Sequence, residues 1–321
     1  MKRLSEIKLW FPKATKVALV ADSNVERLYA GRAARELESA GGITVERLSF
    51  PAGEGSKNLD TYSKLISALA TLGFSRSDVI VALGGGVTGD LAGFAAATYM
   101  RGIPFVQVPT TLLAMVDSSI GGKTGVDIPE GKNLAGAFHL PEKIIRDYSF
   151  LETLDRTQLN NGFAEMIKTA VLFDRELFEV LKRKPAGEEL FAAIERTAGW
   201  KEKIVDEDFR EGGRRMLLNL GHTLAHALEK VSNFRVPHGE AVAVGMRAVS
   251  KRVPEVGEIL DIYGLGDISS LDAYASRDEL AAAMFYDKKR SGGKITLVVP
   301  YAVGDCRLEQ VDVENVWEWM Q

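Results

Sequence analysis

The chain has 321 residues, 46% of them hydrophobic and 26% charged, and its formal net charge is −4. This is the composition of a globular protein that buries a core, and it gives no reason to expect a nucleic-acid or membrane partner. The single cysteine, Cys306, excludes an intrachain disulfide, and no early apolar run has the length of a signal peptide or a spanning helix, so we expect a cytoplasmic protein.

Short apolar runs alternate with helical patterns in the first half of the chain. The runs predict strands over 16–22, 43–50, 78–86 and 104–111, and the apolar spacing predicts helices over 24–39 and 59–72. This alternation is typical of a mostly parallel sheet with helices on both faces, an α/β Rossmann-like domain. Such sheets bind ligands beyond the carboxyl ends of their strands.

The pattern becomes mainly helical from about Leu154. Helices are predicted over 217–231 and 241–253, and only 294–301 is typical of a strand. We therefore predict two domains, residues 1–154 and residues 155–321, of which the second is mainly α-helical.

A glycine-rich turn over 84–90 follows a predicted buried strand and opens a helical segment. Glycines let the backbone approach a phosphate, and the free N–H groups of a helix start favour an anion, so dinucleotide binding is the preferred interpretation over a plain turn. Two other strand ends carry weaker signals. Asp22 and Asn24 could bind a ribose or adenine but are more typical of a helix cap, and 53–57 is more typical of a surface turn. A long Gly-, Lys- and Ser-rich stretch over 112–141 is predicted to be an ordered functional loop whose lysines suit an acidic substrate.

Three of the four histidines fall between positions 222 and 238. His222 and His226 are four apart on one helix face, and His238 follows, so spacing alone favours these three as ligands of a catalytic zinc. Three carboxylates are also candidate ligands, and spacing does not choose among them; they are Glu165, Glu229 and Glu240. Nearby cations favour a small anionic substrate; they are Lys168, Lys201, Arg215, Lys288 and Lys289.

Four stretches resemble the 3-dehydroquinate synthases, members of the sugar phosphate cyclase group. They are GGGVTGDLAGFAAATYMRG (84–102), PTTLLAMVDSSIGGKTGVDIPEGKNLAGAF (109–138), GFAEMIKTAV (162–171) and REGGRRMLLNLGHTLAHALE (210–229). The resemblance implies a dehydroquinate synthase-like fold, with an N-terminal NAD-binding α/β domain and a helical C-terminal domain that binds metal and substrate. It also implies a homodimer.

The resemblance assigns roles residue by residue, and it changes the ligand set suggested by spacing. The implied ligands of Zn²⁺ or Co²⁺ are Glu165, His222 and His238. The implied substrate contacts are Arg101, Asp117, Lys123, Asn133, Lys168, Lys201, Arg215, Asn219, His226 and one of Lys288 and Lys289, with Arg101 reaching the phosphate from a second subunit. The implied NAD contacts are Asp22, Asn24, Glu54, Lys57, Gly86, Val87, Thr88, Gly89, Asp90, Thr110, Thr111, Lys123, Lys132, Phe150, Leu151, Glu152 and Thr153.

The activity implied by the resemblance is a lyase step of the shikimate pathway, which leads to chorismate and the aromatic amino acids. The substrate would be 3-deoxy-D-arabino-heptulosonate 7-phosphate, oxidised and reduced again by a recycled NAD, with loss of phosphate and closure of a carbocycle. Alternatives are a sister cyclase such as a 2-deoxy-scyllo-inosose or epi-valiolone synthase, a glycerol-type metal-dependent dehydrogenase, or a pseudoenzyme. Three departures stand out: Asp127 where the family usually has Asn, Ala225 for Gly, and a short C-terminal region.

Overall fold

The computed structural model describes residues 4–267, 276–288, 293–312 and 315–319. The chain divides into two compact units, Met1–Leu154 and Asp155–Gln321. The functional domains expected over 1–154 and 155–321 stay predictions. Each unit is described by itself.

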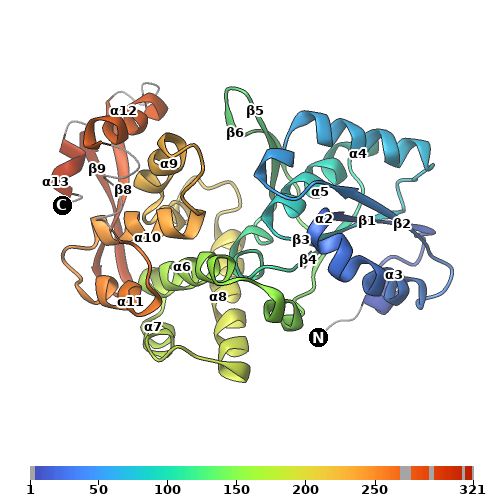
Figure 1. The fold of residues 1–321 in the computed structure, drawn as a ribbon, viewed down its shortest axis with the longest axis horizontal. Helices are drawn as coiled ribbons and strands as arrows, with labels where there is room; N and C mark the ends of the chain where they lie inside the picture. The colour runs from blue at the N-terminus through green and yellow to red at the C-terminus, as the bar shows by residue number, and fades with distance from the viewer. Residues whose placement is uncertain (1–3, 268–275, 289–292, 313–314, 320–321) are drawn as a thin grey trace. The chain divides into compact units, whose positions relative to one another are not determined.

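The first unit contains a five-stranded sheet in the order β2-β1-β3-β4-β7, of which Figure 1 labels β1 to β4. The strands are β1 (Lys16–Asp22), β2 (Thr44–Phe50), β3 (Val79–Gly84), β4 (Phe105–Pro109) and β7 (Lys143–Ile144). Every pairing is parallel, and Val17 of β1 lies opposite Val45 of β2 and Val79 of β3. All residues of β3 and β4 are buried, as expected for central strands covered on both faces.

Several helices of this unit contact the sheet, among them α5 on β1, β3 and β4, and α3 and α4 on β2. The helices of the unit are η1 (Leu4–Glu6), α1 (Ile7–Trp10), α2 (Ser23–Val25), η2 (Glu26–Ala30), α3 (Gly31–Glu38), η3 (Glu54–Ser56), α4 (Leu59–Thr71), α5 (Gly86–Thr98), η4 (Tyr99–Arg101), η5 (Ala114–Ser118) and η6 (Tyr148–Thr153). Leu65 and Leu69 of α4 and Leu91 of α5 join Ile80 of β3 in one buried cluster. Burial of each such side chain contributes about 1.5–3 kcal/mol, so this cluster fixes the sheet that carries the strand ends.

The prediction that residues 112–141 form a long loop is wrong. This stretch holds η5 and an antiparallel hairpin of β5 (Lys123–Ile128) and β6 (Gly131–Phe138), coloured green in Figure 1. Its glycines suggested a loop, but Gly125 and Gly136 lie opposite each other, where the two backbones approach closely and a side chain would collide with the facing strand.

The second unit is mainly helical. Its helices are α6 (Arg156–Phe173), α7 (Arg175–Lys182), α8 (Gly187–Glu207), η7 (Arg214–Asn219), α9 (His222–Val231), α10 (His238–Val249), α11 (Glu255–Tyr263), α12 (Arg277–Lys288) and α13 (Val316–Trp319). α10 packs against α6, α9 and α11. Asp155 and Asp174 start α6 and α7 by accepting hydrogen bonds from Gln158 N and Leu177 N.

The second unit also contains an antiparallel hairpin of β8 (Lys294–Ala302) and β9 (Asp305–Asp312). The strand predicted over 294–301 is therefore confirmed, but β9 was missed because most of its side chains are charged or exposed. The helix predicted from Leu217 is also corrected, since the α-helix begins at His222 after Gly221 takes a left-handed conformation, φ 79°.

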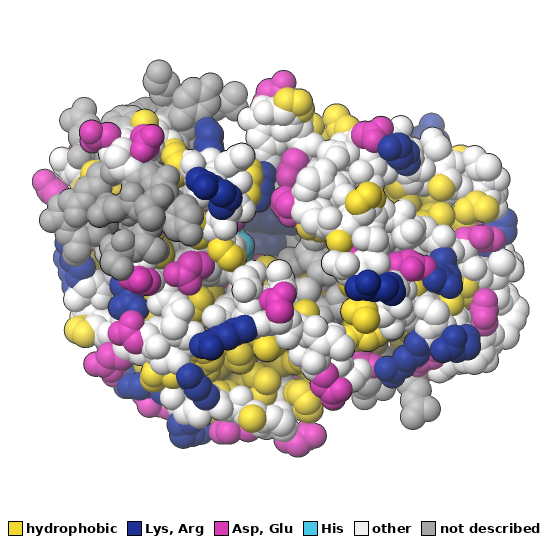
Figure 2. Space-filling view, viewed as in Figure 1, with side chains coloured by type: hydrophobic (Ala, Val, Ile, Leu, Met, Phe, Trp, Pro, Cys, Tyr) yellow, Lys and Arg dark blue, Asp and Glu magenta, His cyan; other side chains and the backbone are white. Residues whose placement is uncertain are grey.

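The parallel sheet with flanking helices and the helical second unit confirm the predicted fold class. Among the described helices, none combines the length and the apolar character needed to cross a membrane. Acidic and basic side chains are both scattered over the face shown in Figure 2, in keeping with the small net charge of −4.

Candidate functional site

Glu165, His222 and His238 form a compact donor cluster in the second unit. Glu165 lies in the buried middle of α6, and the two histidines are the first residues of α9 and α10. One ligand atom from each residue lies within 4.8 Å of the other two. Spacing alone had favoured His226 in place of Glu165; the ring of His226 instead packs edge-on against that of His222, with centroids 5.5 Å apart.

Two glycines allow α6, α9 and α10 to approach one another closely enough for the three donor side chains to meet. At Gly221 an added Cβ would lie 2.6 Å from the carbonyl oxygen of Val242 in α10, and the positive φ there already favours glycine. At Gly239 an added Cβ would collide with the backbone of Asn161 in α6. These contacts bring the start of α9 onto α10, and the start of α10 onto α6.

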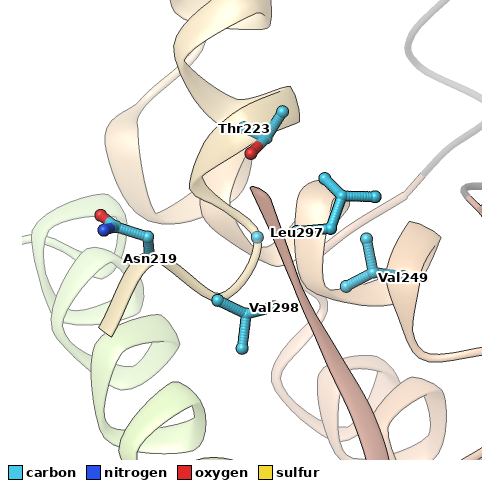
Figure 3. Close-up of a pocket in the computed structure, with 6 residues that line it drawn as sticks. Asn219, Thr223, Val249, Leu297 and Val298 are labelled. Carbon is cyan, nitrogen blue, oxygen red and sulfur yellow. The ribbon is translucent and has the colours of Figure 1, made fainter. Parts of the chain in front are cut away.

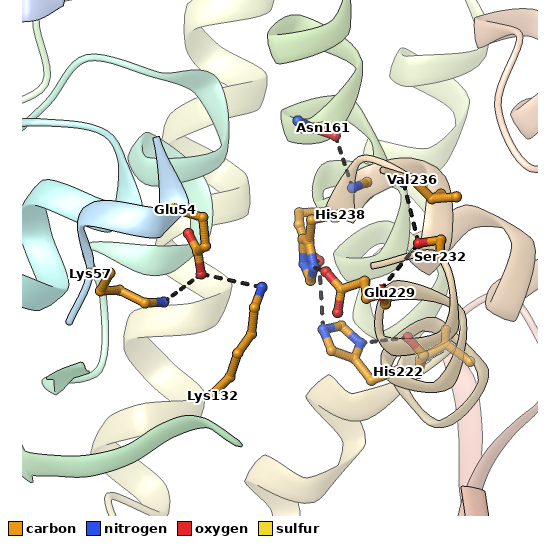
Figure 4. Close-up of polar contacts among 12 residues, drawn as sticks. Glu54, Lys57, Lys132, Asn161, His222, Glu229, Ser232, Val236 and His238 are labelled. Carbon is orange, nitrogen blue, oxygen red and sulfur yellow. Dashed lines mark hydrogen bonds and ion pairs between the residues drawn. The ribbon is translucent and has the colours of Figure 1, made fainter. Parts of the chain in front are cut away.

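Hydrogen bonds fix how both histidines face the cluster (Figure 4). Nδ1 of His222 lies 3.1 Å from the carbonyl oxygen of Leu220, and Nδ1 of His238 lies 3.1 Å from Oε1 of Glu229. Because a carbonyl or carboxylate oxygen only accepts, each Nδ1 carries the proton. Each Nε2 then faces Oε1 of Glu165, at 3.8 Å from His222 and 3.3 Å from His238.

The charges in the cluster are strongly perturbed. Burial and the Lys168 ammonium hold the pKa of His222 well below its usual value, so this imidazole is neutral. Burial opposes charge on His238, but hydrogen bonds to Glu165 and Glu229 outweigh it and raise the pKa of His238 to about 10. The proton on its Nε2 is the one that a metal ion would replace.

The donor set fits a catalytic zinc, which takes about three nitrogen or oxygen ligands and keeps one position open. A buried carboxylate and two imidazole Nε2 atoms converge here, and both Nδ1 atoms are already used. The other two candidate carboxylates have different partners. Glu229 contacts Nδ1 of His238, and Glu240 accepts hydrogen bonds from Gly266 N and Asp267 N.

Three buried cations accompany this cluster in the second unit. Lys168, one helical turn after Glu165, forms an ion pair with its Oε2 and is 2% exposed. Lys201 lies in α8 and Arg215 in η7, and both elements pack against α6. Buried cations on neighbouring elements suit an anionic ligand.

Other expected substrate contacts in this unit have protein partners. Arg215 donates to the carbonyl oxygen of Phe209 at 2.6 Å, and Asn219 Nδ2 donates to Glu211 at 2.8 Å. The side chain of Lys288 and all of Lys289 lie outside the described residues. A small pocket beside Asn219 is lined by Gly221, Thr223, Val249, Leu297 and Val298 (Figure 3); with no charged residue in its lining, it is not suited to a phosphate.

A second cluster, in the first unit, surrounds Lys57, which is 5% exposed. Its Nζ lies 2.9 Å from Glu54, 3.5 Å from Asp90 and 3.8 Å from Asp127, and Lys132 contacts the same oxygen of Glu54 at 3.2 Å. Figure 4 shows the pairs made by Glu54. Burial first, and then the carboxylates of Glu54 and Asp127, raise the pKa of Asp90 to about 7 against the attraction of Lys57.

The expected NAD contacts follow the carboxyl ends of four neighbouring strands. Asp22 and Asn24 follow β1, Glu54 and Lys57 follow β2, the segment 86–90 begins α5 after β3, and Thr110 and Thr111 follow β4. The segment 150–153 lies in η6. Asp22 caps α2 through Asn24 N and Val25 N, which confirms the capping interpretation and leaves its contact with NAD a prediction.

The remaining expected contacts of the first unit lie on η4, η5 and the β5–β6 hairpin. Asp117 is in η5, Lys123 begins β5, and Arg101 is an exposed residue with φ 69°. Asn133 also has a positive φ, 55°, and its N–H donates to Oδ1 of Asp127 at 2.8 Å. The contact of Asp127 with Lys57 was not predicted, because it joins β5 to the segment before α4.

Two family models cover most of the chain: 3-dehydroquinate synthase N-terminal over 47–161 and 3-dehydroquinate synthase C-terminal over 162–290. The 3-dehydroquinate synthase of Streptococcus thermophilus (strain ATCC BAA-491 / LMD-9) is 42% identical, over 98% of this chain and 91% of that protein. The 3-dehydroquinate synthase of Latilactobacillus sakei subsp. sakei (strain 23K) is 41% identical, over 92% and 85%.

Solved structures of related cyclases have the same fold. 2-epi-5-epi-valiolone synthase (ValA) from Streptomyces hygroscopicus subsp. jinggangensis 5008, with NAD⁺ and Zn²⁺ bound, has a TM-score of 0.88 at 26% identity, over 99% of this chain and 94% of that one. A 2-deoxy-scyllo-inosose synthase complexed with carbaglucose-6-phosphate, NAD⁺ and Co²⁺ has a TM-score of 0.87 at 26% identity, over the same shares. With both domain models matched and relatives above 40% identity over most of its length, the chain belongs to the 3-dehydroquinate synthase family.

Proposed function

We propose that this protein is a 3-dehydroquinate synthase, converting 3-deoxy-D-arabino-heptulosonate 7-phosphate into 3-dehydroquinate and phosphate with a recycled NAD and a bound Zn²⁺ or Co²⁺. The observation that carries the proposal is the donor cluster of Glu165, His222 and His238, combined with the family membership. As a lyase of the shikimate pathway it would act in the cytoplasm as a homodimer.

The first unit would bind NAD, and the second would hold the metal and the substrate. Bound NAD supplies a reversible hydride acceptor, and the metal, held by Glu165, His222 and His238, supplies a Lewis acid for a substrate hydroxyl. Lys57 and Lys132 hold Glu54 in place among the expected NAD contacts.

The cationic side chains would hold the two anionic groups of the substrate. Arg215 and Lys201 suit the carboxylate, since a guanidinium pairs with a carboxylate through two parallel hydrogen bonds. Lys123, Asn133, His226 and, from a second subunit, Arg101 suit the phosphate. Because the leaving phosphate can itself take up the proton released at the neighbouring carbon, no additional strong base is needed at that step.

A sister cyclase is the second candidate, because the structural neighbours at TM-scores of 0.88 and 0.87 are a 2-epi-5-epi-valiolone synthase and a 2-deoxy-scyllo-inosose synthase. Sequence identity favours the first candidate, because this chain is 40–42% identical to several 3-dehydroquinate synthases and 26% identical to those two neighbours. The test is phosphate release from 3-deoxy-D-arabino-heptulosonate 7-phosphate, glucose 6-phosphate and sedoheptulose 7-phosphate, with each product identified by NMR. Release from the first alone, giving 3-dehydroquinate, is expected; turnover of only another sugar phosphate would overturn the assignment.

A further inference from the structure

Glu229 is a buried carboxylate of α9, 7% exposed, which the proposed chemistry has not used. Its Oε1 lies 3.1 Å from Nδ1 of His238, whose other nitrogen lies 3.3 Å from Glu165. The imidazole of His238 therefore stands between two carboxylates, one on each nitrogen; Figure 4 shows the one of Glu229.

The position of Glu229 excludes it from sharing a metal with Glu165. The two nitrogens of an imidazole point in different directions, so a carboxylate bonded to Nδ1 is turned away from an ion on Nε2. Its hydrogen bond instead fixes two properties of the ring, namely which nitrogen carries the proton and the rotation that directs Nε2 at Glu165.

The turn between α9 and α10 holds Glu229 and His238 next to each other. The carbonyl oxygen of Glu229 accepts from Phe234 N at 2.8 Å and from Ser232 Oγ at 3.1 Å, and Val236 N donates to Ser232 Oγ at 3.4 Å. These bonds fold the chain back at the end of α9, so that the first residue of α10 returns beside the Glu229 side chain (Figure 4).

The two histidines are supported differently. His222 donates from Nδ1 to the carbonyl oxygen of Leu220, two residues before it in the chain. His238 has a side-chain partner nine residues away in the sequence, on another helix. A substitution can therefore remove the outer support of His238 while the support of His222 stays intact.

We propose that Glu229 is a positioning residue for the metal site, holding His238 with its proton on Nδ1 and its Nε2 directed at the ion. This inference rests on the metal site of the proposed function. Loss of such an outer partner lowers metal affinity by about 10–100-fold while the ligands themselves stay in place.

The test measures zinc affinity of the full chain by competition with a chromophoric chelator, without substrate. Glu229→Gln keeps an acceptor oxygen and the volume of the side chain, so we expect roughly 10-fold weaker binding; Glu229→Ala should bind zinc about 100-fold more weakly, both at one ion per chain. Glu165→Gln removes a ligand and should lose far more. Glu188→Gln, an exposed glutamate of α8, is the matched control and should bind as wild type.

A second measurement distinguishes the loss of the hydrogen bond to His238 from a general destabilisation of the metal site. In zinc-loaded protein labelled with ¹⁵N-histidine, the Nδ1–H signal of His238 should be present in wild type and Glu229→Gln and lost to exchange in Glu229→Ala. The inference would be refuted if Glu229→Gln and Glu229→Ala both bound zinc within twofold of the wild-type affinity. It would also be refuted if Glu229→Gln lost zinc binding as completely as Glu165→Gln, because Glu229 would then be a ligand. Zinc binding without phosphate release by wild type would instead refute the proposed function alone.

Discussion

Asp90→Asn replaces a carboxylate by a neutral amide. The Asp90 carboxylate is one of three that form ion pairs with Lys57, the others being Glu54 and Asp127. Burial first, and then the neighbouring carboxylates, raise the pKa of Asp90 from 3.8 to about 7 despite the attraction of Lys57. The folded protein therefore keeps this proton up to about pH 7, whereas the unfolded chain gives it up near pH 4. Between these values the unfolded state binds fewer protons, so Asp90 lowers stability as the pH rises.

The size of the effect follows from the shift. Each pKa unit corresponds to 1.36 kcal/mol, so a rise of about three units costs about 4 kcal/mol above pH 7. Asparagine resembles the protonated carboxyl in shape and carries no charge. The free energy of unfolding of Asp90→Asn minus that of wild type should therefore rise by about 1.4 kcal/mol per pH unit from about pH 4 to 7 and then level off.

Urea unfolding at pH 5, 6, 7 and 8, followed by circular dichroism, measures this difference. Asp60→Asn is the matched control, because Asp60 pairs with Lys64 on the surface, where both side chains are about three-quarters exposed; its free energy of unfolding should stay within about 1 kcal/mol of that of wild type. A difference for Asp90→Asn that is flat with pH, or that falls as the pH rises, would refute the electrostatic reasoning. We also expect weaker NAD binding, since Asp90 is among the expected cofactor contacts.

Three further substitutions test other parts of the structure. Gly239→Ala adds a methyl group that collides with the backbone of α6, so it should cost about 1–3 kcal/mol and weaken zinc binding, whereas Gly199→Ala, with open space around it in α8, should be neutral or slightly stabilising by calorimetry. Asp78→Ala removes the acceptor of five hydrogen bonds, three from Thr15 and Lys16 at the start of β1 and two from Ser75 in the turn before β3, and should lower the free energy of unfolding by about 3–5 kcal/mol in urea; a loss below 1 kcal/mol would contradict that role. Asp127→Asn removes a charge that helps to raise the pKa of Asp90, so in an Asp127→Asn background the stability difference made by Asp90→Asn should level off at a lower pH, and levelling off at an unchanged pH would contradict the coupling.

The sequence predicted the central strands of the parallel sheet well because these strands are buried and almost entirely apolar, whereas the short edge strand β7 was not predicted. β1 and β3 are the clearest cases. The β5–β6 hairpin and β9 could not be predicted in this way. Glycines that permit close strand pairing resemble loop glycines, and β9 has mostly exposed side chains whose pattern carries no core signal.

The candidate site shows the same limit. Histidine spacing located the region of the site. It could not show that Glu165 faces both histidines, because Glu165 lies more than fifty residues before His222 in the chain. The packing of α6 against α10 brings these residues together. The family resemblance supplied that pairing. The partner of His238 was harder to see, since Glu229 lies on the same face of α9 as His222 and looked equally suited to be a ligand.

The central claim is that this protein turns over its substrate with a recycled cofactor and a metal. The direct measurement is phosphate released from 3-deoxy-D-arabino-heptulosonate 7-phosphate per NAD⁺ added, with metal removed by chelator and then restored with zinc. We predict many phosphates per NAD⁺, no net NADH, loss of activity with chelator and its return with zinc. NADH accumulating in step with substrate consumed would indicate a dehydrogenase, and no phosphate release by zinc- and NAD-bound protein would contradict the account.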